Sequence, residues 1–337
     1  MQQPAEPGQP LMTPWVIRVV ATLGLADLMA EGVSRLEDLS ARTRTHTESL
    51  GRLLRYLTCR GVFAEPEPGR FVLNDEALPF LDGHPDGLRA RLDLTGAVGR
   101  IDQTFSHLLE TIRTGRPAYA IVHGRPFFDD LQDDPERSAS FDALMRRRSS
   151  QDLPLLLDGF DWAAVRSVAD VGGGTGALLA GLLRAHPGLR GTLVERPMTA
   201  ERAAHTMREA GVDDRCDLVA GDFFQPLPAG HDVYLLRNVI CDWDDARAAA
   251  ILRRCGQAAG PDGRVLVMDQ VLADDADRCE VTASDLYMLL VYGGKERELA
   301  EFDRLAAAAG LRLGTARPTR STSWLLEMTV SQGGRRP

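Results

Sequence analysis

The chain has 337 residues, which is long for one ordinary domain and suits two. With 44% hydrophobic and 26% charged residues, it has the composition of a soluble globular protein. A formal net charge of −9 argues against a general nucleic-acid binder and favours small-molecule chemistry. No apolar run is long enough to span a membrane, and the first residues lack the pattern of a signal peptide. The 5 cysteines include no CxxC pair, which predicts free thiols in a reducing cytoplasm.

The first part of the chain predicts a winged-helix pattern. After a loose tail of residues 1–12, apolar residues between Leu11 and Glu31 recur at helical spacing. The stretch "SRLEDLSARTRTHTESLGRLLRYLT" predicts two short helices, with Ser34 as the N-cap of the first. The stretch "CRGVFAEPEPGRFVLND" predicts a hairpin around a Pro/Gly turn. Three helices followed by a hairpin are typical of a winged helix, here assigned to residues 13–90.

The remaining chain predicts an α/β domain preceded by a helical segment. Residues 87–158 are helical in pattern, with a break at "GRPAYAIVHGRP". Apolar runs of strand length then alternate with helical stretches, at "SVADV", "RGTLVE", "CDLVAG", "DVYLLR" and "GRVLVMD". This alternation predicts a parallel sheet covered on both faces, closed by an antiparallel pair, "LRLGTARPT" and "SWLLEMTV". We expect a helical linker over 91–155 and a second domain over 156–332.

A glycine-rich turn is the strongest motif. In "VADVGGGTGALLAGLL" a strand ends near Asp170, a turn contains Gly172, Gly174 and Gly176, and a helix follows. Such glycines let the backbone turn tightly and approach a ligand closely. Glu195 ends the next strand, where a carboxylate can accept both ribose hydroxyls of a nucleotide. The alternative is a glycine-rich turn that binds nothing.

The acidic residue before the turn distinguishes between nucleotides. Dinucleotide-binding turns have the spacing GxGxxG and place a pyrophosphate at the helix N-terminus. Here Asp170 would repel a phosphate, but it suits the ammonium group of S-adenosylmethionine. The turn therefore favours methyl transfer over hydride transfer.

Two further segments end at the same predicted sheet edge. In "AGDFFQPLP", Asp222 is positioned to accept from the adenine amine and Phe223 to cover the adenine face; a capping Asp and a core Phe are the alternative. The fourth strand leads to Arg237, Cys241, Asp242 and Trp243 at the carboxyl edge, where open α/β sheets bind ligands.

These motifs carry a resemblance to a known family. "VADVGGGTG", "AGDFFQPLP", "LLRNVICDWDD" and "YGGKERELAEF" resemble the S-adenosylmethionine-dependent O-methyltransferases of the plant caffeate type and their bacterial natural-product relatives. "DLTGAVGRID", "TGRPAYAIVHGRPFFDDL" and "SFDALM" resemble the naphthoate O-methyltransferases of enediyne pathways. The resemblance covers about residues 13–330. It implies a winged-helix dimerisation domain, a swapped homodimer, a Rossmann-like catalytic domain and a small aromatic acceptor.

The resemblance makes Cys241 unusual. The family has His-Asp-Trp there, with the histidine as general base, whereas this chain has Cys-Asp-Trp. Asp269 and Glu296 match the positions of the family's two supporting acids, with Asp269 one carbon shorter than the family's Glu. A thiol of pKa near 8.5 is a poor base unless a neighbour lowers that pKa. Because Asp242 and Asp244 disfavour a thiolate by like charge, a neutral pocket wall is the favoured role of Cys241.

Several alternatives follow from the missing histidine. The acceptor ionises unaided, or the nucleophile is a ring carbon or an amine, or the fold no longer methylates and runs a hydroxylation, decarboxylation or cyclisation. His107 and His123 lie in the segment that the family places over the acceptor, and each is a substitute base or a surface histidine. The run Arg146, Arg147, Arg148 is a solvated helix face or a partner for an acceptor carboxylate.

We expect a methyltransferase of bacterial secondary metabolism that uses S-adenosylmethionine and no metal. A ligand-sensing winged-helix regulator is the alternative from another class. Its DNA-reading module would need a stronger positive charge than the slight excess of Arg in residues 34–74.

Overall fold

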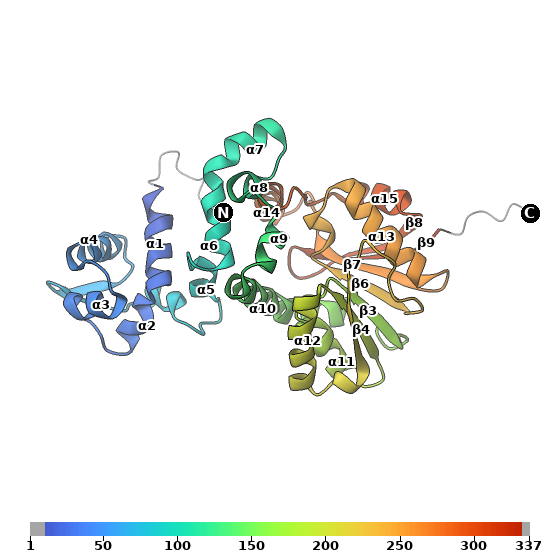
Figure 1. The fold of residues 1–337 in the computed structure, drawn as a ribbon, viewed down its shortest axis with the longest axis horizontal. Coiled ribbons are helices and arrows are strands. Elements are labelled where there is room, and N and C mark those ends of the chain that lie inside the picture. Colours follow the sequence, from blue (N-terminus) through green and yellow to red (C-terminus); the bar gives the residue numbers. More distant parts are fainter. Residues whose placement is uncertain (1–10, 332–337) are drawn as a thin grey trace, which may run out of the picture. The chain divides into compact units, whose positions relative to one another are not determined.

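The computed structural model describes residues 11–331, which form two compact units. One unit takes the chain up to Gln103 together with Asp134–Phe141; the other takes Thr104–Asp133 and the chain from Asp142 onward. Figure 1 labels their elements. Within 11–331, no helix combines the length and the apolar character needed to cross a bilayer. The limits predicted from the sequence, 13–90, 91–155 and 156–332, divide the chain into a winged helix, a helical linker and a second domain. This division by expected role stays a prediction.

The first unit contains the predicted helices and hairpin. Its elements in chain order are α1 (Met12–Leu23), α2 (Leu25–Ala30), α3 (Leu36–Thr43), α4 (Thr47–Thr58), β1 (Ala64–Glu67), β2 (Arg70–Val72), η1 (Asp75–Phe80), α5 (Leu88–Leu92) and α6 (Ala97–Asp102). Strands β1 and β2 are antiparallel, as a hairpin requires. Leu25, Leu39, Leu54 and Phe71 are fully buried in its core.

Two details of this unit differ from the sequence prediction. The apolar pattern between Leu11 and Glu31 forms two helices, because Gly24 adopts φ +61° and ends α1. Ser34 does not cap α3: Arg35 occupies the N-cap position and makes no side-chain cap. The Ser34 carbonyl instead accepts from Phe71 N–H at 2.8 Å, which joins this segment to the hairpin. Of the predicted tail, residues 1–10 lie outside the described range, and α1 begins at Met12.

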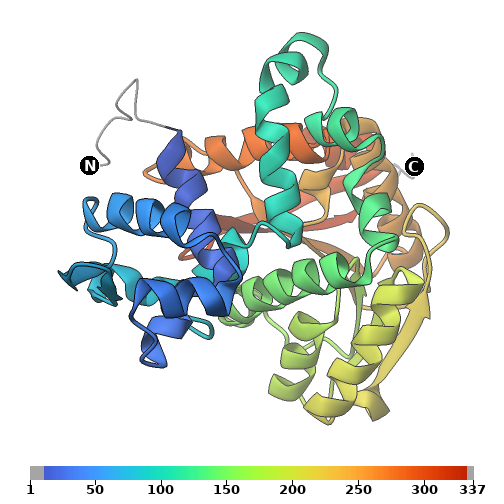
Figure 2. The same cartoon turned by 60° about the vertical axis from the view of Figure 1, so that its left-hand side comes forward.

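Short helices precede the sheet in the second unit. They are η2 (Gln103–His107), which begins at the unit boundary, then α7 (Leu108–Thr114), α8 (Ala118–His123) and α9 (Phe127–Gln132). Gly115 and Gly124 adopt positive φ on either side of α8, so the predicted break is a helix between two glycine caps. Helix α10 (Pro135–Gly159), drawn in green in Figure 2, follows, and its residues up to Phe141 belong to the first unit.

The sheet has the predicted parallel core and antiparallel closing pair. Its strands are β3 (Ser167–Val171), β4 (Arg190–Glu195), β5 (Cys216–Ala220), β6 (Val233–Arg237), β7 (Arg264–Gln270), β8 (Leu311–Pro318) and β9 (Ser323–Val330). They lie in the order β5-β4-β3-β6-β7-β9-β8, and β9 runs antiparallel to both neighbours. The strand order reverses between β3 and β6, the point at which open α/β sheets bind ligands.

Helices cover both faces of this sheet, as its apolar strands predict. Helices α11 (Ala177–Ala185) and α12 (Pro197–Ala210) share one buried cluster with the sheet. Helices α13 (Asp245–Ala259) and α15 (Leu299–Ala308) share the cluster on the other face (Figure 1). The remaining elements are η3 (Asp213–Arg215), η4 (Ile240–Asp242) and α14 (Arg278–Val291). The predicted α/β architecture is confirmed.

Candidate functional site

The predicted glycine turn joins β3 to α11. Gly172, Gly174 and Gly176 have φ of +74°, +59° and +76°, a backbone region that side chains strongly disfavour. A Cβ added at Gly172 would lie 3.0 Å from the Val239 side chain, whereas one at Gly174 would meet nothing within 4 Å. The turn is therefore packed at its base and open at Gly174, where a ligand can approach the backbone.

Glu195 lies at the end of β4 and is fixed against this turn. Its Oε2 accepts from Gly174 N–H at 3.0 Å and its Oε1 from Arg196 N–H at 2.8 Å. Burial raises the pKa of Glu195, and these two backbone donors lower it. Each oxygen keeps lone pairs beyond its backbone bond, so the carboxylate is oriented and still able to accept from a ribose diol.

Asp170 is buried beneath the turn. It is 1% exposed, and neither carboxyl oxygen has a hydrogen-bond partner among the described residues. Burial and then the charge of Glu195 raise its pKa to about 7, while Arg237 acts in the opposite direction. A buried polar group without a partner is costly, which fits a position completed by a ligand or a proton. The predicted contact of Asp170 with an ammonium group stays a prediction.

Aromatic side chains lie beside the turn, after β5 and β6. Phe223 approaches Gly172 so closely that a Cβ there would lie 3.4 Å from the ring. Trp243 makes edge contacts with Phe223 and Phe224 at centroid distances of 6.0 and 5.0 Å. Asp222 is exposed and accepts from Phe224 N–H at 2.9 Å, a capping bond that leaves its other oxygen available. These positions suit an adenine ring and its amine.

Arg237 has a partner that the sequence did not indicate. Its Nε donates to Asp152 Oδ2 at 2.7 Å, and the Arg237 side chain is 8% exposed. The pair connects α10 to the end of β6. A direct contact between Arg237 and the cofactor stays a prediction.

These residues fit S-adenosylmethionine. An open glycine backbone, an oriented carboxylate at Glu195, an unpartnered buried carboxyl at Asp170 and an aromatic surface at Phe223 are together at one sheet edge. The glycine backbone leaves room for the ligand, Glu195 suits a ribose, Asp170 suits an ammonium group and Phe223 suits an adenine ring.

A buried acidic cluster lies at the neighbouring end of β6 and β7. Cys241 on η4 is 6% exposed, Asp269 on β7 is 0% exposed, and Glu296 before α15 is 5% exposed. Cys241 N–H donates to Asp269 Oδ2 at 3.2 Å, and Ser284 Oγ donates to Glu296 Oε1 at 2.8 Å. The structure therefore brings together the three residues predicted to be catalytic. In the described range, no group of three or more acidic, His or Cys side chains is arranged to hold a metal ion.

Burial holds protons on this cluster. Burial first, and then Glu296, raise the pKa of Asp269 to about 8; burial raises that of Glu296 to about 7. Burial and the charges of Asp269, Asp242 and Glu296 raise the pKa of the Cys241 thiol well above its ordinary value. The thiol is therefore neutral near pH 7, which supports its predicted role as a pocket wall.

One part of the electrostatic prediction is wrong. Asp244 is exposed and caps α13, where its Oδ1 accepts from Arg247 N–H at 2.9 Å. Desolvation, which the sequence argument did not include, is the main effect on the Cys241 thiol, and Asp269 contributes the largest like charge.

Arg297 is a functional residue that sequence reasoning missed. Its side chain is 0% exposed. It donates to the carbonyls of Ile240 at 3.0 Å, Trp243 at 2.7 Å and Lys295 at 3.3 Å, and to the Asp245 carboxylate at 2.9 Å. A guanidinium with its donors spread over two segments fixes them to each other. The signal was its position directly after Glu296, in a motif already recognised.

The backbones of these two segments also touch. Lys295 N–H donates to the Cys241 carbonyl at 2.9 Å. A Cβ at Gly294 would lie 2.0 Å from the same carbonyl oxygen, so only glycine allows this approach. The segment that carries Cys241 and the segment that carries Glu296 thus form one rigid support.

An aromatic wall borders the acidic cluster. The Tyr292 ring stacks on Phe128 with centroids 5.3 Å apart and an interplanar angle of 16°. Phe127 contacts Tyr292 and Tyr119 edge-on, at 5.3 and 5.2 Å. Burial first, and then the charges of Tyr287 and Asp242, raise the pKa of Tyr292, which places this wall next to the cluster. A flat apolar surface beside acidic groups suits a planar aromatic acceptor.

Of the two candidate histidines, His123 packs against Tyr119 with ring centroids 4.5 Å apart, and His107 Nδ1 lies 3.1 Å from Ser106 Oγ. Their role as substitute bases stays a prediction.

In the arginine run, Arg148 differs from its neighbours because its charge lowers the pKa values of Asp242, Glu296 and Tyr292. Arg146 acts on Asp142 instead.

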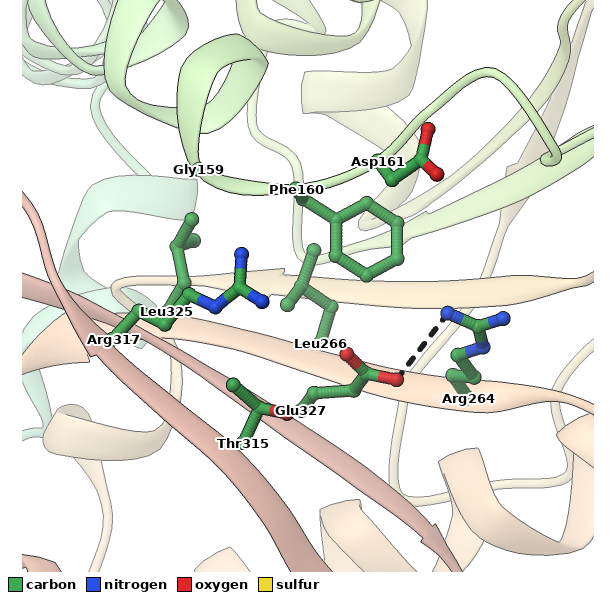
Figure 3. A pocket seen from close by; sticks show the side chains of 9 residues that line it. All are labelled: Gly159, Phe160, Asp161, Arg264, Leu266, Thr315, Arg317, Leu325 and Glu327. Carbon is green, nitrogen blue, oxygen red and sulfur yellow. Dashed lines mark hydrogen bonds and ion pairs between the residues drawn. The ribbon is translucent and has the colours of Figure 1, made fainter.

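A separate cavity of 170 Å³ lies near the start of β7. Figure 3 shows its lining, in which Arg264 pairs with Glu327 at 3.3 Å and Phe160 lies above Leu266. Because Arg264 begins β7, this cavity is at the opposite end of the strand from Asp269. It is distinct from the site above.

Comparisons with known proteins identify the family. Residues 105–312 match the O-methyltransferase domain family, and residues 9–81 match the O-methyltransferase dimerisation domain. The chain is 44% identical over 320 residues to 2,7-dihydroxy-5-methyl-1-naphthoate 7-O-methyltransferase of Streptomyces carzinostaticus, covering 95% of each. It is 45% identical over 324 residues to aclacinomycin 10-hydroxylase RdmB of Streptomyces purpurascens, covering 95% of this chain and 87% of the relative.

A solved structure agrees. The O-methyltransferase NcsB1 from neocarzinostatin biosynthesis, in complex with S-adenosylmethionine and 2-hydroxy-5-methyl naphthoic acid, superposes with a TM-score of 0.91. It is 42% identical, with 97% of this chain and 99% of that chain covered. The predicted resemblance, enzyme class and cofactor are confirmed. The chain belongs to the S-adenosylmethionine-dependent O-methyltransferase family.

Proposed function

We propose that this enzyme methylates a small planar aromatic acceptor in bacterial natural-product biosynthesis, at a phenolic hydroxyl or, as the next choice, at an activated ring carbon. One observation carries the proposal. The glycine turn with Glu195 and the acidic cluster of Cys241, Asp269 and Glu296 follow strands of one parallel sheet at its carboxyl edge, and the charge of Asp242 acts on Tyr292 of the aromatic wall. The naphthoate relatives support an acceptor of this shape.

The cofactor residues have distinct roles in this proposal. S-adenosylmethionine supplies an electrophilic methyl group when bound. Glu195 accepts the ribose hydroxyls, Asp170 faces the ammonium group, and Asp222 accepts from the adenine amine. The remaining predicted contacts are made by Gly172, Gly174, Gly176, Phe223, Arg237 and Trp243. Holding two reactants in line is worth up to about 7–11 kcal/mol in well-oriented systems, so positioning provides much of the rate.

The three predicted catalytic residues act through shape and charge. Cys241 is a neutral wall of the acceptor pocket. Asp269 fixes the Cys241 backbone, and Glu296 keeps an unpartnered oxygen beside it. With pKa values raised to about 8 and about 7, these two acids retain protons near neutral pH and avoid placing several negative charges at the site.

A second candidate function is a reaction without methyl transfer. Cys241 replaces the family's base, and a relative of 45% identity is named a hydroxylase. In that case the aromatic wall would still hold the acceptor, and the bound S-adenosylmethionine would organise the pocket without losing its methyl group.

A labelled-methyl assay separates the two. The enzyme is incubated with methyl-deuterated S-adenosylmethionine and a panel of hydroxynaphthoates, anthraquinones and simple phenols, and products are analysed by mass spectrometry. We expect label in the product and an equal amount of S-adenosylhomocysteine, with both reduced in Glu195→Ala. Acceptor consumption with unlabelled product and no S-adenosylhomocysteine would contradict methyl transfer.

Assembly and location complete the proposal. The match to a dimerisation domain supports a homodimer through the first unit. Leu11, Met12 and Trp15 of that unit are 83%, 54% and 43% exposed, and a partner would cover such apolar side chains. All five cysteines are free, which supports the predicted reducing cytoplasm.

A further inference from the structure

We propose that Asp242 takes the proton of the acceptor hydroxyl, and so provides the base that Cys241 does not. The inference rests on the proposed methyl transfer to an oxygen. It concerns Asp242, which follows Cys241 directly and is partly exposed, unlike the two acids of the cluster.

Accessibility distinguishes Asp242 from the other two acids. Asp269 Oδ1 and Glu296 Oε2 are shut off from solvent and have no partner. Asp242 as a residue is only partly buried, and its Oδ2 does not belong to that closed set, whereas its Oδ1 accepts from Cys241 Sγ. A base must come within hydrogen-bond reach of the proton that it accepts, so Asp242 alone among the three meets this condition without a rearrangement.

The neighbouring thiol supports Asp242 as the acceptor of a proton. Cys241 Sγ lies 4.0 Å from Asp242 Oδ1, with the sulfur as donor. Because burial keeps the thiol protonated, Cys241 presents an S–H to Asp242 and does not compete with it for the acceptor proton. The side chain that replaced the histidine thus lies against the carboxylate that takes over its role.

Charged groups on the elements around Asp242 change its pKa. Burial has the largest effect and raises the pKa of Asp242, and Asp269 on β7 and Glu296 before α15 raise it further wherever they are ionised. Arg148 on α10 acts in the opposite direction, and Tyr292 after α14 adds a phenol. A carboxylate of ordinary pKa near 3.9 is a weak base for a phenol near 10. The raised pKa of Asp242 makes proton transfer from a phenol more favourable, and Arg148 acts against the rise.

The chemical step balances. The acceptor O–H bond breaks and its proton passes to an oxygen of Asp242. The oxygen's electron pair forms the new bond to the methyl carbon, and the C–S bond breaks with its pair remaining on sulfur. The sulfonium thereby becomes a neutral thioether, and Asp242 later releases the proton to solvent.

The test compares two acceptors in wild type and Asp242→Asn. With an ordinary phenol we expect kcat to fall by about 10²–10⁴-fold, the range for loss of a general base. With a nitro-substituted analogue that is already ionised at the assay pH, we expect a loss below tenfold. Calorimetry should give unchanged S-adenosylmethionine affinity. Equal losses on both acceptors would overturn the inference, because a structural role does not depend on acceptor acidity.

Two further measurements keep the test decisive. If Asp242→Asn does not fold, Asp242→Glu is measured in its place. Because Glu retains a base, the ratio of the kcat values for the two acceptors should stay near the wild-type ratio. A changed ratio would contradict the inference. Label transfer by the wild-type enzyme is established first. Failure of that step counts against the proposed function, whereas an unaltered acceptor ratio in Asp242→Asn counts only against Asp242.

Discussion

Replacing Arg297 by Met should destabilise the enzyme and misplace its acidic cluster. Arg297 is 0% exposed and donates to three carbonyls and to the Asp245 carboxylate. Met fills a similar volume but donates no hydrogen bond. The Trp243 carbonyl then has no other donor in the described part of the chain, whereas the Ile240 carbonyl keeps a bond from Trp243 N–H at 3.3 Å.

The magnitude follows from these partners. Leaving the buried Trp243 carbonyl unpaired costs about 1–3 kcal/mol in the free energy of unfolding. The Ile240 and Lys295 carbonyls each lose one hydrogen bond, and each adds less than that. Asp245 is 63% exposed, so its lost ion pair contributes little. We expect a loss of about 2–4 kcal/mol in the free energy of unfolding. At about 3 °C per kcal/mol, Tm should fall by about 6–12 °C. Below the unfolding range, kcat should fall by about 10²-fold, as for a misplacement near 1 Å.

The assay is thermal unfolding together with label transfer at a temperature where the variant is folded. Arg253→Met is the matched control, because Arg253 is exposed and donates one bond, to the Ala308 carbonyl at 2.8 Å. The control should remain within about 0.5 kcal/mol of wild type. If Arg297→Met were as stable and as active as the control, the rigid support formed by the two segments would be refuted.

Cys241→Ala should keep kcat within about tenfold of wild type. Cys241→His should give no gain in kcat at pH 7 with the true acceptor. A clear rate increase for the histidine variant would show that the site lacks a base. Glu195→Ala should weaken S-adenosylmethionine binding by at most a few kcal/mol, since charge-assisted hydrogen bonds contribute about 1.5–3 kcal/mol each; unchanged affinity by calorimetry would remove Glu195 from the site. Asp269, with its pKa raised to about 8, holds a proton when folded that the unfolded chain releases above about pH 4, so stability should fall as pH rises from about 4 to 8. Asp269→Asn should flatten that dependence in denaturant titrations, and an unchanged slope would argue against the buried proton. Light scattering at micromolar concentration should give a dimer, and a monomer would contradict the assignment of the first unit.

The sequence alone predicted the α/β sheet and its binding edge. Buried parallel strands appear as short apolar runs, so their limits and alternation with helices were readable one segment at a time. The glycine turn and Glu195 were predictable for the same reason, because each follows directly from the end of a strand. Cys241 was recognised as a departure from the family motif by its position in that motif alone.

The tertiary structure decided the contacts between distant segments. Asp152 lies 85 residues from Arg237, and Arg297 lies 57 residues from Ile240, so no local pattern announces either pair. Likewise, Ser34 was expected to cap a helix, but its carbonyl bonds to the hairpin. The protonation of Cys241 also depends on the fold, because desolvation and the charges of Asp269 and Glu296 arise only when three segments of the chain close around one site.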